Sequence, residues 1–425
     1  MSDSKNENLV CNFCGKNRND VEKLIAGPNV YICNECVSIS YDIIEKDPDE
    51  IDIHSLAYDD LPKPKEIKEF LDEYVIGQDS AKELLSVHSY NHYKRISKLI
   101  KDTVIEKSNI LLIGSTGTGK TLLAKTLAKK LGVPFAIADA TTLTESGYVG
   151  EDVESVLERL LSLADYDIEK AQRGIVFIDE IDKKARRSES NTNTRDVSGE
   201  GVQQALLRLI EGTTTKVKLQ NGKKFGDEFS EFDTSNVLFI LSGAFVGIED
   251  IIEKRIKRKS NIGFNSKIVD KEERNKLLDE VMNNDVVNFG LIPELVGRLP
   301  VIATLEQLNK KQLRLLLTEI KNSTLEQVKS LLELDGIELF FGEDYLDFVA
   351  EKCFRSKIGA RSIKSLIDNS VTNLMYRIEE FKNRGVKSIR LDKYPYKYEY
   401  NPVLITETGE EIDTEFKLYR GINDF

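Results

Sequence analysis

The chain has 425 residues and carries 60 Lys and Arg against 72 Asp and Glu, a formal net charge of −12. This length allows two to four domains, and a hydrophobic fraction of 40% excludes intrinsic disorder of the whole chain. The longest apolar stretch, 236–248, is shorter than the roughly 18–20 residues of a membrane span, and no targeting segment stands at the N-terminus. We therefore expect a soluble, cytoplasmic protein with no membrane partner and no general surface for polyanions.

Four of the five cysteines form two Cys-x2-Cys pairs, Cys11 with Cys14 and Cys33 with Cys36. Two such pairs can place four thiolates in a tetrahedron around one Zn²⁺. A unit of about 40 residues cannot bury enough core to fold unaided, so the metal would supply folding free energy. We predict a structural zinc module over 1–46, with one ion per chain, whose few basic residues favour a protein partner over nucleic acid.

An acidic, proline-containing segment, 47–64, follows and is typical of a linker. Over 65–305, apolar runs suited to buried strands alternate with helical patterns. Such alternation predicts a parallel sheet with helices on both faces, in a large α/β domain. The runs are 109–113, 174–178 and 237–241.

Helical patterns dominate after residue 300, with short strand signals at 336–340 and 387–391. They predict a second, smaller α+β domain over 306–393. The remaining segment, 394–425, has no clear periodicity, and its role is left open.

Residues 114–121 match the pattern G-x4-G-K-[ST], directly after a predicted strand and before a helical pattern. The glycines let backbone N–H groups surround phosphates, and the helix N-terminus adds its positive end. Lys120 would contact the β- and γ-phosphates, and the Thr121 hydroxyl would bind Mg²⁺. The predicted nucleotide-binding residues of this loop are Ser115, Thr116, Gly117, Thr118, Gly119, Lys120, Thr121 and Leu122.

A second motif, Asp179-Glu180, ends the apolar run 174–178. Asp179 at a strand end fits the carboxylate on the Mg²⁺ side, and Glu180 fits the base that polarises the attacking water. A strand that ends in Asp-Glu is a weak signal alone. Together with the phosphate-binding loop it predicts hydrolysis of ATP or a close relative.

The order and spacing of these motifs resemble the AAA+ class of ATPases, and further stretches resemble the ClpX family of protein unfoldases within it. They cover the zinc module, the ATPase domain and the start of the small domain. These stretches are 24–28 (LIAGP), 74–78 (YVIGQ), 147–150 (GYVG), 195–201 (RDVSGEG), 262–264 (IGF), 291–300 (LIPELVGRLP) and 359–361 (GAR).

The resemblance implies a homohexameric ring that binds ATP with Mg²⁺. Val75 and Ile76 match the adenine pocket of the family. Arg298 matches the arginine finger that reaches a neighbouring subunit's nucleotide, and Arg361 matches the second arginine sensor. From the residues alone, both arginines could equally be ordinary surface side chains. No residue near Ser242 is assigned as the first sensor.

The resemblance also implies contacts with substrate and with a ClpP-type peptidase. From the residues alone, 147–150 could equally be a turn whose tyrosine packs on the core. The basic run 253–259 could be read as a nucleic-acid patch, but the pattern favours a solvated helix face beside the segment 262–264. Residues 223–225 (Lys-Lys-Phe) stand where the family has Arg-Lys-His, so the tag preference is left open. The implied pore residues are Tyr148, Val149, Arg195, Lys223 and Lys224, and the implied docking residues are Ile262, Gly263 and Phe264.

The predicted function is that of an ATP-dependent unfoldase that moves proteins with terminal degradation tags through an axial pore to a separate peptidase, and that also remodels complexes. Adaptors are candidate partners of the zinc module. No peptidase motif is present, since His88 and His92 lack the Glu of H-E-x-x-H and Ser198 lacks the first glycine of G-x-S-x-G. The alternative is a nucleic-acid-remodelling ATPase with a zinc ribbon, against which the net charge and 147–150 both speak.

Overall fold

The computed structural model describes residues 10–27, 30–45, 61–97, 103, 105–144, 151–186, 197–219, 228–259, 277–356, 358–393 and 400–413. The chain divides into two compact units, Met1–Asp52 and Ile53–Phe425. Among the described helices, none combines the length and the apolar composition that crossing a membrane requires.

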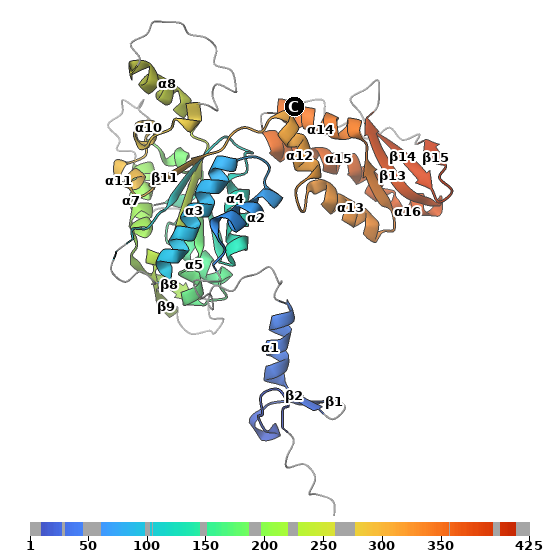
Figure 1. Ribbon diagram of the computed structural model, residues 1–425, viewed down its shortest axis with the longest axis horizontal. Helices are drawn as coiled ribbons and strands as arrows, with labels where there is room; N and C mark the ends of the chain where they lie inside the picture. The colour runs from blue at the N-terminus through green and yellow to red at the C-terminus, as the bar shows by residue number, and fades with distance from the viewer. Residues whose placement is uncertain are drawn as a thin grey trace, which may run out of the picture. The chain divides into compact units, whose positions relative to one another are not determined.

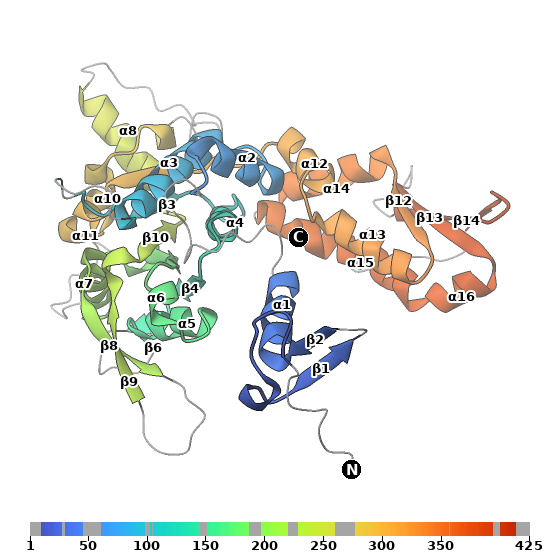
Figure 2. The same cartoon turned by 60° about the horizontal axis from the view of Figure 1, so that its bottom comes forward.

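The first unit is a small zinc-finger-like module. Strand β1 (Leu24–Gly27) pairs antiparallel with β2 (Val30–Cys33), and helix α1 (Asn34–Glu45) follows directly (Figure 2). Among the side chains of residues 10–18, 20–27, 30–38 and 40, those of Cys11 and Cys33 are buried and the others are not. These residues by themselves therefore form no apolar core.

The second unit begins with a large α/β domain around a sheet of five strands in the order β11-β3-β10-β7-β4. All four neighbouring pairs are parallel, which confirms the predicted parallel sheet. The three central strands are the three predicted from apolar runs. The strands are β3 (Ile110–Ile113), β4 (Phe135–Asp139), β7 (Ile175–Asp179), β10 (Leu238–Gly243) and β11 (Val301–Thr304).

Helices cover both faces of this sheet (Figure 1), because alternate residues of each strand face opposite sides. On one face, Ile110 and Phe177 pack against α2 (Pro64–Tyr74), α3 (Asp79–Ile96) and α4 (Lys120–Leu131). The other described helices are α5 (Ser155–Leu163), α6 (Ile168–Ala171), α7 (Val197–Glu211), α8 (Ile248–Lys259), α10 (Asn283–Phe289) and α11 (Pro293–Gly297).

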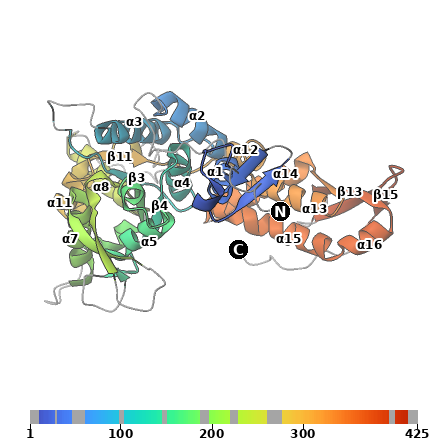
Figure 3. The same cartoon turned by 90° about the horizontal axis from the view of Figure 1, so that it is seen from below.

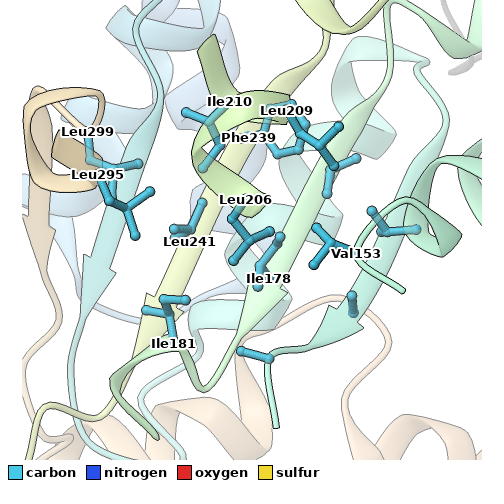
Figure 4. Packing of buried hydrophobic residues seen from close by; sticks show 14 of the residues in the cluster. Val153, Ile178, Ile181, Leu206, Leu209, Ile210, Phe239, Leu241, Leu295 and Leu299 are labelled. Atoms are coloured by element: carbon cyan, nitrogen blue, oxygen red, sulfur yellow. The ribbon is translucent and has the colours of Figure 1, made fainter. Parts of the chain in front are cut away.

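The opposite face carries a second core, part of which Figure 4 shows. Ile178 and Leu241 from the strands meet Leu206 of α7 and Leu295 of α11 there. The remaining elements of this domain are β5 (Leu143–Thr144), β6 (Glu151–Asp152), β8 (Thr214–Leu219), β9 (Glu228–Asp233) and the 3-10 turns η3 (Ile181–Lys184) and η4 (Thr234–Asn236).

The small domain, labelled from α12 to α16 in Figure 3, has its own core. Its four-stranded sheet has the order β12-β13-β14-β15. The first pair is parallel and the other two are antiparallel. Its elements are α12 (Lys310–Thr318), α13 (Thr324–Leu334), β12 (Glu338–Phe341), α14 (Glu343–Arg355), the 3-10 turn η5 (Gly359–Arg361), α15 (Ser362–Tyr376), α16 (Ile378–Asn383), β13 (Val386–Lys393), β14 (Tyr400–Thr406) and β15 (Glu411–Asp413).

Strands β14 and β15 correct one expectation. The sequence analysis set 394–425 apart as a tail without periodicity, yet both strands belong to the sheet of the small domain. Leu404 is fully buried in β14, whereas Val403 and Ile405 beside it are only partly buried. Pro402 is buried in the same strand, but a proline cannot donate to a strand ladder and is an unusual strand residue, so the period-two pattern of β14 was not recognised from sequence.

Candidate functional site

The phosphate-binding loop connects the end of β3 to the start of α4 at Lys120. Gly117 and Gly119 have φ values of +84° and +99°, a region that side-chain-bearing residues rarely adopt. A Cβ atom on Gly117 would also lie 2.8 Å from the carbonyl oxygen of Ile358. Glycine is therefore required here both by the backbone conformation and by the close approach of the small domain.

Lys120 is 9% exposed, and its side chain turns back into the loop. The Nζ atom donates hydrogen bonds to the carbonyl oxygens of Gly114 at 2.6 Å and Ser115 at 3.1 Å. Burial lowers the pKa of Lys120 from its usual value, and the negative charge of Asp179 partly opposes this shift. The loop thus holds a buried ammonium group where phosphate charge would stabilise its protonated form.

Asp179 lies at the carboxyl end of β7, and its carboxylate accepts hydrogen bonds from side chains of two other elements, α4 and β10. Its Oδ2 atom accepts a hydrogen bond from Thr121 Oγ1 at 3.3 Å. Its Oδ1 atom accepts one from the Ser242 hydroxyl, at the end of the neighbouring strand β10. A carboxylate beside a hydroxyl supplies the oxygen ligands that Mg²⁺ prefers, so Asp179 and Thr121 fit this ion.

Glu180 is exposed and follows Asp179 with a positive φ of +57°. Its backbone N–H donates to Asp179 Oδ1 at 2.9 Å. The turn η3 then continues to Asp182, whose carboxylate accepts hydrogen bonds from the backbone N–H groups of Ala244 and Phe245, each at 3.3 Å. These bonds tie the segment after β7 to the loop after β10.

These groups border a cavity of about 450 Å³, a size typical of small-molecule sites. It contains every predicted nucleotide-binding residue except Ser115, which instead lines an adjoining cavity of about 220 Å³ with Cys353 and Phe354. The cavity residues that the sequence analysis missed are Asp182, Lys183, Ala244, Val246, Leu308, Leu316, Ile320 and Ala360.

The two predicted arginines occupy different places. Arg361, in η5 of the small domain, lines the cavity. Arg298 does not: it follows α11, its side chain is 53% exposed, and its Nε atom lies 2.9 Å from Glu211 Oε1. Arg298 is thus exposed and away from the nucleotide cavity of its own chain.

Eight predicted residues lie outside the part of the chain that the structure describes. They are Tyr148, Val149, Arg195, Lys223, Lys224, Ile262, Gly263 and Phe264.

The four cysteines of the first unit come together in space. Their sulfur atoms all lie within 4.8 Å of one another, and the Sγ atoms of Cys14 and Cys33 are 3.7 Å apart. A tetrahedral Zn²⁺ with bonds of about 2.3 Å would separate its thiolates by about 3.8 Å. The backbone N–H groups of Cys33 and Cys36 point at thiol sulfurs, at 3.3 and 3.4 Å. The residues fit a closed zinc site in which all four ligands are cysteine thiolates.

Comparisons with known proteins agree with this arrangement. Residues 9–46 match the ClpX C4-type zinc finger, residues 105–302 the AAA domain (Cdc48 subfamily), and residues 308–383 the C-terminal D2-small domain of ClpB protein. A relative from Bacteroides fragilis, the ATP-dependent Clp protease ATP-binding subunit ClpX, is 47% identical over 386 residues, which cover 89% of this chain and 93% of that protein. The chain therefore belongs to the ClpX family of AAA+ ATPases.

Proposed function

We propose that the chain is an ATP-dependent protein unfoldase that delivers its substrates to a separate ClpP-type peptidase. The observation that carries this proposal is the cavity itself, which joins the phosphate-binding loop and Glu180 of the large domain to Arg361 of the small domain. A nucleotide bound there contacts both domains, so its hydrolysis changes contacts to each of them. The similar protein from Bacteroides fragilis is an ATP-binding subunit of the Clp protease, which supports a separate peptidase as the partner.

In the proposed reaction, Lys120 binds the β- and γ-phosphates, and Thr121 with Asp179 holds Mg²⁺, which neutralises phosphate charge. Glu180 is exposed at the cavity and free of the bonds that occupy Asp179, so its carboxylate can polarise the attacking water. Val75 and Ile76 form the adenine side of the cavity.

The proposed assembly is a homohexameric ring in the cytoplasm. The exposed Arg298, away from its own cavity, supports a role at a neighbouring subunit's nucleotide. Tyr148 and Val149, with Arg195, Lys223 and Lys224, are proposed to contact the translocating chain. Docking to the peptidase is assigned to 262–264, and adaptor binding to the zinc module.

A folded fluorescent reporter with an unstructured C-terminal tag tests this function when mixed with the protein, a ClpP-type peptidase and ATP. We expect ATP-dependent loss of fluorescence. The Tyr148→Ala variant should hydrolyse ATP but unfold the reporter poorly, whereas Tyr148→Phe, which keeps the aromatic ring, should retain most of the activity. Full unfolding by Tyr148→Ala would refute the pore assignment. ATP hydrolysis stimulated by nucleic acid, without unfolding, would refute the proposed function.

A further inference from the structure

The turn between α2 and α3 contains a buried glutamine, Gln78, whose side chain bonds to two distant segments. Gln78 is 8% exposed and has a φ of +61°, a conformation that non-glycine residues keep only where the surroundings enforce it. Its Nε2 atom donates to the carbonyl oxygen of Thr118 at 3.3 Å and to that of Glu306 at 2.8 Å. Its Oε1 atom accepts from the Glu306 N–H at 2.9 Å.

The two partners belong to parts of the molecule with different tasks. Thr118 lies in the phosphate-binding loop, and Glu306 lies in the connection between β11 of the large domain and α12 of the small domain. One amide group therefore holds the loop that surrounds the phosphates and the chain segment about which the small domain would move.

The same connection also contacts the start of the phosphate-binding loop. The N–H of Leu305 donates to the carbonyl oxygen of Ile113 at 2.8 Å. A Cβ atom on Gly114 would lie 2.8 Å from the carbonyl oxygen of Leu305. The connection thus packs against the start of the loop directly and is joined to Thr118 through the side chain of Gln78.

The turn that carries Gln78 is itself firmly held. The Nζ atom of Lys82, which is 2% exposed, donates to the carbonyl oxygen of Val75 at 2.6 Å and to Asp72 Oδ1 at 2.7 Å. Because the backbone of this turn is held in place, a displacement of Thr118 can be transmitted through the Gln78 side chain to Glu306.

The small domain also contacts the last turn of α2, just before this turn. The N–H of Lys321 donates to the carbonyl oxygen of Glu73 at 2.8 Å, and the two side chains form an ion pair at 2.8 Å. Gly77, in the same turn, has a φ of +66°, and a Cβ atom there would lie 2.7 Å from Gln312 Nε2 of the small domain, which would have to shift.

We propose that Gln78 is a positioning residue that couples the phosphate-binding loop to the connection between the two domains. The inference rests on the proposed ATP-driven function and adds a route by which the loop acts on the small domain. Phosphates bond to the N–H groups of the loop and so shift its carbonyl groups. Because Nε2 is shared between Thr118 and Glu306, a shift of the first carbonyl changes the bond to the second. Arg361, by contrast, senses the nucleotide by direct contact.

Hydrogen exchange of the Glu306 amide tests this proposal, measured on the full chain with and without Mg²⁺ and a non-hydrolysable imido analogue of ATP. The variant Gln78→Glu keeps the side-chain length and an acceptor for the Glu306 N–H, but its ionised carboxylate has no donor for the two carbonyl groups. In the unsubstituted protein, we expect the nucleotide to change the exchange rate about two- to tenfold, the range of one net hydrogen bond. In Gln78→Glu the response should fall below about twofold, while affinity for a fluorescent ADP analogue stays within about twofold.

Gln203 offers a matched control. It is fully buried, its Nε2 atom donates to the carbonyl oxygen of Lys184 at 2.7 Å, and its Oε1 atom accepts from the Ile292 N–H at 2.8 Å. Gln203→Glu therefore loses an equivalent donor without touching the phosphate-binding loop. It should keep the full nucleotide response at Glu306.

Four results would each overturn the proposal. They are an unchanged response in Gln78→Glu, loss of the response in Gln203→Glu as well, a parallel loss of nucleotide affinity in Gln78→Glu, and no response in the unsubstituted protein. If Gln78→Glu does not fold, Gln78→Asn replaces it, because asparagine tolerates the positive φ but is one methylene too short to reach both partners.

The test also separates this proposal from the proposed function. It needs only nucleotide and the chain, so its outcome stands even if no reporter is unfolded. Where unfolding is observed, Gln78→Glu should keep its KM for ATP but consume more ATP for each reporter molecule unfolded. A residue with a merely structural role would lower stability without changing this ratio.

Discussion

Asp179 and Glu180 are adjacent acids with different surroundings. The carboxylate of Asp179 is occupied by the hydroxyl groups of Thr121 and Ser242 and by a backbone N–H. Glu180 is exposed at the cavity, and the positive φ of its backbone turns the chain sharply after the strand. The difference supports the proposal that the first acid binds the metal and that the second activates water.

The variant Glu180→Gln should bind ATP normally and hydrolyse it about 10²- to 10⁴-fold more slowly, because the amide cannot accept a proton from water. Phosphate release measures hydrolysis, and a fluorescent ATP analogue measures binding. Glu169→Gln, at an exposed glutamate of α6, is the control and should hydrolyse ATP at the normal rate. An unimpaired Glu180→Gln would exclude this residue as the base.

Lys107 gives a prediction for the dependence of stability on pH. Its Nζ atom donates to the carbonyl oxygen of Thr234 at 2.9 Å and lies 4.7 Å from the centre of the Phe239 ring. Burial, with a smaller contribution from Arg95, lowers the pKa of Lys107 to about 7. In the unfolded chain the group stays protonated up to about pH 10. Between these values the unfolded state binds more protons, so this residue makes stability rise with pH.

Unfolding by denaturant between pH 7.5 and 9.5 checks this sign. In Lys107→Met the free energy of unfolding should rise less steeply with pH than in the unsubstituted protein, by on the order of 1 kcal/mol per pH unit. Lys125→Met, at an exposed lysine of α4, should leave the slope unchanged. Equal slopes for all three proteins would show that Lys107 stays charged in the folded state.

At the scale of elements, burial decides which strands the sequence reveals. The runs that became β3, β7 and β10 are apolar almost throughout because the sheet buries them on both faces. The outer strands β4 and β11 alternate between buried and more exposed residues, and the sequence analysis did not identify them. Central strands are therefore readable from hydrophobic runs, whereas edge strands depend on neighbours that the sequence does not show.

The residues of the nucleotide site divide in the same way, into those that local sequence patterns reveal and those that depend on neighbours in the folded chain. Lys120, Asp179 and Glu180 lie in local motifs, so their positions could be predicted from sequence. Gln78 and Ser242 contact the site only because particular strands and turns become neighbours in the folded chain. Ser242 carried one usable signal: it ends a buried strand, as Asp179 does, and the carboxyl ends of parallel strands meet at one edge of a sheet.

We expect the fold of the zinc module to depend on its metal, since among the side chains of 10–18, 20–27, 30–38 and 40 the buried ones are those of Cys11 and Cys33. We expect one zinc per chain by elemental analysis. Cys36→Ser should lose the zinc, and residues 10–45 should then exchange their amide hydrogens rapidly. Cys353→Ser, in α14 of the small domain, is the control and should retain one zinc. Slow exchange over 10–45 without zinc would contradict a metal-dependent fold.

At the scale of the whole molecule, the position of Arg298 predicts that the active site is completed by a second copy of the chain. The side chain is half-exposed, pairs with Glu211 and does not line the cavity of its own chain. If it serves a neighbour, Arg298→Ala should bind nucleotide normally yet hydrolyse ATP on the order of 10³-fold more slowly. This result alone does not distinguish an Arg298 that acts at the nucleotide of a neighbouring subunit from one that acts within its own chain.

Mixing two inactive variants distinguishes these two possibilities for Arg298. An Arg298→Ala subunit keeps its own Glu180, and a Glu180→Gln subunit keeps an Arg298 that it can offer to a neighbour. Random mixing of equal amounts in a closed ring creates a complete site at about one quarter of the interfaces, so ATP hydrolysis should reappear at about that fraction of the normal rate. A mixture of Glu180→Gln with the double variant Glu180→Gln/Arg298→Ala contains no complete site and should stay inactive. If the first mixture also stays inactive although the subunits assemble together, Arg298 acts within its own chain, and the shared active site must be abandoned.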